Sequence, residues 1–205
     1  MTCSIKKEVI EKTIEFHGHS CPGLAIGIRV SELAMEKLDI QNAKAPVCVT
    51  ETDMCGVDAI QFLTGCSYGK GNLIHKDYGK SAFTFYDRDS QKGFRAVFMD
   101  NFADDEKQTD DTRVLMKKMI QGNATKQEEE QLQKLRNDRI NRILQADLKN
   151  IFLTEDVDTP PVRPARILKS IQCDSCGETT MESRIRLFDD KNLCIPCFQN
   201  VEQKI

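Results

Sequence analysis

The chain has 205 residues, a length that suits one medium-sized domain with a real core plus a small module. Its formal net charge is -3, so charge alone gives no reason to expect binding to nucleic acid or to an acidic membrane. Residues 1–7 lack the apolar segment of a secretory signal, and no apolar run reaches the length of a membrane span. The nine cysteines therefore indicate thiols and metal ligands in a reducing compartment, and the expected location is the cytoplasm.

Two helices and a strand are predicted at the start of the chain. The apolar spacing predicts a helix from about Ser4 to Phe16. A second helix is expected from Pro22, because proline fits the first turn of a helix, and its apolar character on most sides predicts a central position. Residues 47–50 are rich in β-branched side chains and predict a short strand.

A third helix and a β-hairpin follow. Thr52 or Asp53 is the predicted cap of the helix, and Gly65 is predicted to end it in the left-handed conformation. Residues 81–86 alternate with Phe83 and Phe85 expected to point inward, and residues 94–99 supply the second strand of the hairpin. The expected fold class is α+β, with a small, mostly antiparallel sheet packed with helices.

A pair of long helices is predicted in the second half. One ends at Gly122, and the next opens with the capping box from Thr125 to Glu128 and carries an amphipathic stripe as far as Leu148. This helical pair is expected to cover the sheet or to form a dimer interface. The core domain is predicted to span residues 1–155, and a basic, proline-containing linker is predicted at 156–170.

The C-terminal residues 171–205 predict a small zinc domain. Cys173 and Cys176 form one Cys-x-x-Cys pair, and Cys194 and Cys197 repeat it after seventeen residues, a spacing typical of a four-cysteine zinc site. A strand at 181–187, a turn and a short helix from Pro196 are expected, which together resemble a treble-clef finger. So small a module cannot bury a core alone, so the metal would stabilise its fold; iron is the alternative metal for the same ligands.

A second candidate site lies in residues 16–23, which place His17, His19 and Cys21 before the central helix. Cys21 falls at or beside the helix N-cap, where backbone N–H groups favour a thiolate. Cys55 is predicted at another helix start, three residues before Asp58 on the same face. Both helix starts can direct their thiols into one cleft. Three or four of the histidine and cysteine side chains there could then bind a soft divalent metal and leave one coordination position open.

Two further residues complete the predicted core site. Cys66 follows the end of the third helix and is expected to return to the cleft, and Lys70 lies in a glycine-rich loop where it could meet an anion. That loop lacks the glycine and hydroxyl positions of a phosphate-binding loop. Cys3 and Cys48 are expected to serve as small apolar residues, and His75 is expected to be an isolated surface histidine.

These stretches resemble the family named for the E subunit of formylmethanofuran dehydrogenase. The resemblance covers residues 16 to about 100 and is carried by residues 17–23, 55–61 and 64–72. It implies an α+β core that tends to dimerise, with the C-terminal finger as an auxiliary domain of some relatives. The namesake accompanies a molybdenum or tungsten enzyme that fixes carbon dioxide as a formyl group on methanofuran. By resemblance, this chain is an accessory or redox component, and other subunits of such an enzyme are its expected partners.

The resemblance supports the same core residues as the geometric argument. The candidate ligands of a second divalent metal are His17, His19, Cys21, Cys55 and Cys66. The candidate catalytic groups are Cys21, His19, Cys55 and Asp58, and Lys70 is the candidate cofactor contact. Two other functions stay open: a zinc-finger regulator that binds nucleic acid or protein, and a carrier that inserts a metal or cofactor. Net acidity weighs against nucleic acid.

Overall fold

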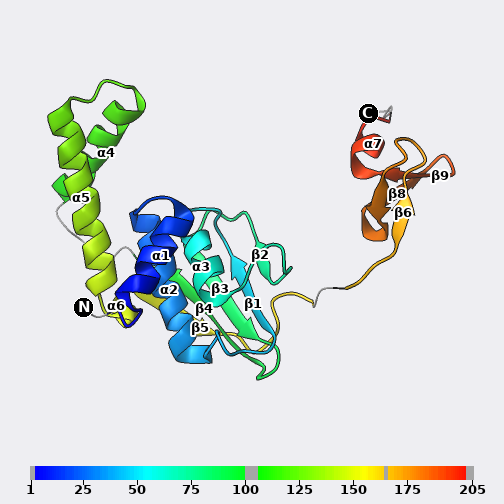
Figure 1. Ribbon diagram of the computed structural model, residues 1–205, viewed down its shortest axis with the longest axis horizontal. Coiled ribbons are helices and arrows are strands. Elements are labelled where there is room, and N and C mark those ends of the chain that lie inside the picture. Colours follow the sequence, from blue (N-terminus) through cyan, green and yellow to red (C-terminus); the bar gives the residue numbers. More distant parts are fainter. Residues whose placement is uncertain (1–2, 100–105, 164–165, 202–205) are drawn as a thin grey trace. The chain divides into compact units, whose positions relative to one another are not determined.

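The computed structural model describes residues 3–99, 106–163 and 166–201 (Figure 1). It divides into two compact units, Met1–Arg163 and Pro164–Ile205, which are described separately. Residues 164–165 of the predicted linker and 202–205 of the predicted finger lie outside the described residues.

Three helices begin the first unit: α1 (Lys7–His17), α2 (Pro22–Leu38) and α3 (Gly56–Thr64). Gly18 and Gly65 end α1 and α3 in the left-handed conformation, with φ of 91° and 68°, which costs little without a side chain. The predicted cap of α3 is wrong, because the helix begins only at Gly56 and Cys55 holds the N-cap position. The Thr52 hydroxyl instead accepts a hydrogen bond from the Met54 N–H in the preceding turn.

The described residues of the first unit form a mixed sheet of five strands in the order β2-β1-β3-β4-β5. The strands are β1 (Pro46–Thr50), β2 (Leu73–His75), β3 (Ala82–Asp87), β4 (Lys92–Phe98) and β5 (Phe152–Asp156). Only the β1–β2 pair is parallel, so the predicted mostly antiparallel sheet is confirmed. The hairpin of β3 and β4 was predicted, whereas β2 and β5 were not.

The core lies between the sheet and α2 and α3, which pack against each other over one of its faces (Figure 1). The strand register sets Cys48 opposite Phe85 and Phe85 opposite Phe94, so these side chains share the helix-covered face. Val30 and Ala34 of α2 pack on them and are fully buried. Cys48 belongs to this apolar cluster, where burial raises the pKa of its thiol far above the usual value.

A helical hairpin of α4 (Glu106–Ile120) and α5 (Lys126–Gln145) follows the sheet, and the short α6 (Leu148–Ile151) leads into β5. The predicted capping box is present: the Glu128 N–H donates to the Thr125 hydroxyl, and the Glu128 carboxylate accepts from the Thr125 N–H. The predicted cover of the sheet by this hairpin is not observed. The C-terminal half of α5 packs on α2 through Ile140 and Ile143, and its other half pairs with α4.

The second unit holds two short hairpins and a helix. Its elements are β6 (Ser170–Gln172), β7 (Thr179–Met181), a 3-10 turn (Glu182–Arg184), β8 (Ile185–Phe188), β9 (Lys191–Cys194) and α7 (Ile195–Gln199). The strand predicted at 181–187 is wrong in one respect, because the 3-10 turn divides it and its two ends pair with different strands. Asp189 and Asp190 form the β8–β9 turn with positive φ values.

No helix within the described residues is long and apolar enough to cross a membrane.

Candidate metal centres

A close contact between α2 and α3 positions the first candidate centre. A Cβ atom on Gly27 would lie 2.2 Å from the Gly56 carbonyl oxygen, so the backbones meet where neither residue has a side chain. One turn earlier on α2, a Cβ on Gly23 would lie 3.9 Å from the Cys55 sulfur and 4.0 Å from the Cys21 sulfur. The glycine contact therefore brings the N-terminal ends of both helices, and the two thiols, together.

Both thiols of this centre stand at helix starts. Cys21 is the N-cap of α2, and its Sγ accepts a hydrogen bond of 3.3 Å from the Leu24 N–H. Cys55 is the N-cap of α3, but burial and the neighbouring Cys21 thiol raise the pKa of its own thiol. A helix start alone thus does not make Cys55 a thiolate here, whereas a bound cation would favour the ionised form.

Two histidines approach these thiols from the end of α1. His17 is the last residue of α1, and its Nδ1 lies 2.7 Å from Oδ2 of Asp58 on α3. Its other ring nitrogen, Nε2, lies 4.0 Å from the Cys21 sulfur. Gly18 then turns the chain so that the His19 ring lies beside the His17 ring, with centroids 4.5 Å apart. The Asp58 contact on Nδ1 leaves Nε2 of His17 free to face the thiols.

The donor atoms of His17, His19, Cys21 and Cys55 all lie within 4.8 Å of one another. Donors bound to one tetrahedral zinc ion would be roughly 3.6 Å apart, given bond lengths of about 2.3 Å to sulfur and 2.0 Å to nitrogen. The 4.0 Å between the Cys21 sulfur and His17 Nε2 is close to that value, so the set fits a soft divalent metal. His19 is exposed and the other three are half-buried.

Two residues predicted for this centre do not belong to it. Cys66 and Lys70 follow the C-terminal end of α3, whereas Cys55 precedes its N-terminus, and nine helical residues separate the two ends by about 13 Å. Cys66 is fully buried in the cluster that contains Cys48, and burial raises the pKa of its thiol. Lys70 Nζ donates to the Gly65 carbonyl oxygen at 3.0 Å, so it caps the helix end.

Three exposed apolar side chains next to the centre were not singled out from the sequence. Phe16 precedes His17 and is 56% exposed, and Met54 precedes Cys55 and is 63% exposed. Phe62 lies one helical turn beyond Asp58, and its ring centroid is 5.5 Å from that of Phe16. Phe16 and Met54 are next to ligand residues in the sequence, but the exposure of these side chains could not be predicted from it.

The second unit holds the other centre. The sulfurs of Cys173, Cys176, Cys194 and Cys197 lie within 4.8 Å of one another, and those of Cys176 and Cys194 are 3.9 Å apart. Backbone N–H groups, first that of Cys176 and then that of Cys194, lower the pKa of the Cys173 thiol to about 6. Four thiol ligands at this spacing match a closed structural zinc site.

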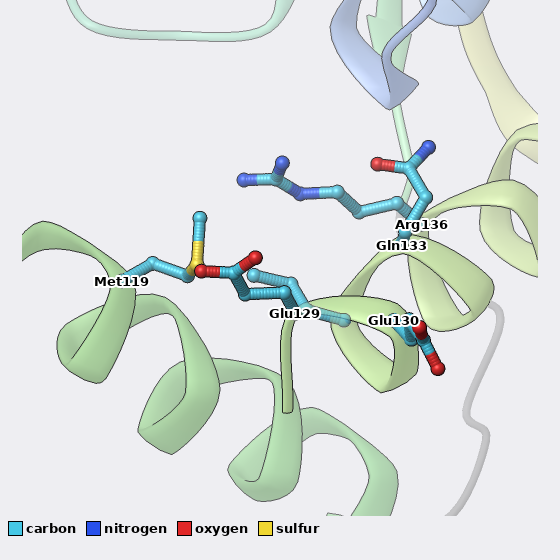
Figure 2. Close-up of a pocket in the computed structure, with 6 residues that line it drawn as sticks. Met119, Glu129, Glu130, Gln133 and Arg136 are labelled. Carbon is cyan, nitrogen blue, oxygen red and sulfur yellow. The ribbon is translucent and has the colours of Figure 1, made fainter. Parts of the chain in front are cut away.

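A groove of about 350 Å³ lies between α4 and α5, and its lining residues belong to neither candidate centre. Met119 from α4 and Glu129 and Arg136 from α5 line it (Figure 2). Leu132 forms part of its wall and is buried, whereas Met119 is 40% exposed. Val114, Met119 and Ile120 of α4 are exposed, so α5 covers the apolar side chains of α4 only in part.

An α+β core with a His-Cys donor set, joined to a four-cysteine module, is the architecture of a metal-binding protein with an auxiliary zinc domain. The family model described as "FmdE, Molybdenum formylmethanofuran dehydrogenase operon" matches residues 16–153. The chain belongs to this FmdE family, and the resemblance seen in the sequence is confirmed. The model "Prokaryotic dksA/traR C4-type zinc finger" matches residues 166–203, so the C-terminal unit is a zinc-binding domain.

Two individual proteins extend the comparison. A "Probable S-adenosyl-L-methionine-binding protein" of Archaeoglobus fulgidus is 30% identical over an alignment of 189 residues that covers 89% of this chain and 50% of that protein. The chain therefore spans about half the length of this curated relative. The crystal structure of a "tungsten formylmethanofuran dehydrogenase subunit e (fmde)-like protein" from Syntrophus aciditrophicus aligns with a TM-score of 0.61 and 23% identity, over 96% of this chain and 94% of that one. This match shows the fold.

Proposed function

We propose that the first unit binds a catalytic or exchangeable divalent metal, and that the protein is an accessory component of molybdenum- or tungsten-dependent formyl or formate metabolism. The observation that carries the proposal is the convergence of His17, His19, Cys21 and Cys55 at a half-exposed position. Structural zinc sites are closed by four protein ligands, as in the four-cysteine centre, whereas catalytic sites keep one position for water or substrate; the exposed His19 is the donor at which the core centre would open. Family membership supports the metabolic context.

Four residues of the centre would bind the metal, and a fifth would position one of them. Cys21, Cys55 and the two histidines would hold zinc or another soft divalent ion. Such an ion, when bound, polarises a carbonyl group or a water molecule. Asp58 keeps the His17 ring in place through the 2.7 Å contact with Nδ1. Redox chemistry at a molybdenum or tungsten cofactor would belong to partner subunits.

Metal analysis and co-purification test this proposal. The full chain should carry two metal ions, and the C21S/C55S variant should carry one. A C3S variant is the matched control, because Cys3 is a buried thiol outside both candidate centres. From its native host, the tagged wild-type chain should recover subunits of a molybdenum or tungsten enzyme in defined proportion. Equal metal content in wild type and C21S/C55S would contradict the metal centre, and recovery of no such subunit would contradict the metabolic role.

Binding of S-adenosyl-L-methionine is the second candidate function. It is supported by the printed name of the archaeal relative, which is 30% identical over 89% of this chain. Equilibrium dialysis with labelled S-adenosyl-L-methionine tests this candidate. Saturable binding of one molecule per chain would support it. No binding would contradict it and would place the ligand of the archaeal relative in the half of that protein outside the alignment.

We also propose that the protein is a homodimer in the cytoplasm, with the α4–α5 hairpin in the interface. On α4, Ile120 is 81% exposed, and Met119, which lines the groove against α5, is 40% exposed. An I120E substitution should convert the dimer to a monomer at micromolar concentration in light scattering. Q121E, the same charge change at the next, exposed residue, should leave it dimeric. A monomeric wild-type chain would refute the proposal.

A further inference from the structure

The two histidines of the core centre are held very differently. The His17 side chain is only 10% exposed, and its Nδ1 is fixed by Asp58 at 2.7 Å. His19 is exposed and lies in the short connection between α1 and α2. Within the described residues no hydrogen bond is recorded for the His19 ring, whose observed neighbours are the His17 ring and the two thiols.

The backbone of each cysteine is fixed at the start of a helix. Cys21 Sγ accepts a hydrogen bond from the Leu24 N–H, and its backbone is fixed as the N-cap of α2. Cys55 stands at the start of α3, which the Gly27–Gly56 contact locks against α2. Three donors are therefore set by helix ends and their packing, while the fourth, His19, depends on a loop.

We propose, on the basis of the metal centre proposed above, that His19 is the exchangeable ligand of that centre. A small neutral donor atom of the substrate takes the place of the His19 nitrogen. Rotation of the His19 ring into water breaks no recorded hydrogen bond. Release of His17 would instead break its 2.7 Å contact with Asp58 and move a side chain that is only 10% exposed. The exchange breaks the bond from the metal to the His19 nitrogen and forms one to the incoming donor, with no change in oxidation state.

Charge defines the class of incoming donor. Two thiolates, Cys21 and Cys55, neutralise a divalent cation, and Asp58 adds negative charge through His17. A neutral carbonyl oxygen or imine nitrogen replaces the neutral imidazole without adding charge, whereas an anion would make the site negative and is disfavoured. The exposed Phe16 and Met54 side chains next to the ligands suit an uncharged donor with an apolar remainder.

Cobalt substitution of the full-length protein tests this inference. The visible spectrum of the core site is obtained as the difference between wild type and C21S/C55S, in which only the four-cysteine centre binds cobalt. Imidazole should change this spectrum and saturate, while azide should act at least about tenfold more weakly, because azide is charged. H19A should keep one cobalt at the core with less than about a tenfold loss of affinity. In H17A the cobalt affinity of the core should fall by at least roughly tenfold to hundredfold, which is the loss caused by removing a residue that only positions a metal ligand.

The outcomes separate this inference from the proposed function. H75A is the control, because His75 is an exposed histidine on β2 outside both centres. Equal losses of affinity in H19A and H17A, or a wild-type cobalt spectrum that imidazole leaves unchanged, would overturn the exchange of His19 while the metal centre stands. A stronger response to azide than to imidazole would overturn the neutral donor. A wild-type core that takes up no cobalt would overturn the metal centre itself.

Discussion

Replacement of Gly27 by alanine tests how the fold builds the core centre. The new methyl group would lie 2.2 Å from the Gly56 carbonyl oxygen and 2.5 Å from the Gly56 Cα, whereas ordinary contact starts at 3.4 Å, so α2 and α3 must part by roughly 1 Å. Alanine in a helix interior would otherwise gain about 1 kcal/mol over glycine. Overpacking against backbone costs about 3 kcal/mol, so we expect a net loss of about 2 kcal/mol in the free energy of unfolding.

The same displacement should weaken the metal centre. Metal–ligand distances tolerate about 0.2 Å, well below the expected shift of Cys55 relative to Cys21, so cobalt affinity at the core should fall by more than about tenfold. Urea unfolding and cobalt titration measure the two effects. The control is G69A, since a Cβ on Gly69 meets nothing within 4 Å and both quantities should stay unchanged. A G27A protein that is as stable as wild type and binds cobalt equally well would refute the reasoning.

Three further predictions concern other parts of the chain. R29M should lower the free energy of unfolding by about 3 kcal/mol in urea, because it leaves the buried Glu32 carboxylate, whose Oε2 lies 2.5 Å from Arg29 Nη1, without its charged partner. The double variant R29M/E32L should recover most of this loss, and a double variant as unstable as R29M would contradict the pairing. The hydrogen bonds of Arg95 lower the pKa of Glu51 below 4.5, so the pair stabilises the fold fully above that pH, and its contribution is lost as pH falls through the lowered pKa. E51Q should weaken the fall of the free energy of unfolding with pH in urea titrations, and an unchanged pH dependence would count against the pairing. A strong chelator should unfold the C-terminal module and leave the first unit folded, as followed by hydrogen exchange; protection of the module without metal would contradict a zinc-dependent fold.

Features set by local sequence were predictable. The doubled Cys-x-x-Cys spacing predicts one four-sulfur site, because each pair brings two sulfurs together within a few residues, and the hairpin β3–β4 follows from its alternation. The Thr125 capping box depends only on residues within one helical turn. The sites of Cys21 and Cys55 at helix starts follow from similar local signals, although the start of α3 was placed too early.

Features that depend on distant contacts were not predictable. The strand β2 has three residues and exists because it pairs in parallel with β1, and β5 pairs with β4 across the whole helical hairpin. The Lys70 side chain is engaged by the end of α3, a contact that depends on how the following loop folds; the separation of Cys66 from Cys55, by contrast, already followed from the rise of the predicted helix between them. The exposure of Phe16 follows from how α1 meets α3, and no spacing in the sequence reports that.

The convergence of the four donors in the core depends on both kinds of information. Sequence proximity explains why His17, His19 and Cys21 are neighbours, but only the packing of α2 on α3 adds Cys55 and brings Asp58 to the His17 ring. The glycine contact responsible joins residues 27 and 56, and each glycine taken alone resembles any small residue in a helix.

The number of metal ions per chain tests the central claim most directly. Elemental analysis of the full-length protein, purified without chelator, should give two ions for wild type, one for C21S/C55S and two for C3S. X-ray absorption at the metal lost in C21S/C55S should show two sulfur and two nitrogen donors, with bonds of about 2.3 Å and 2.0 Å. One ion per chain in both wild type and C21S/C55S, with four sulfur donors only, would contradict a metal centre in the core.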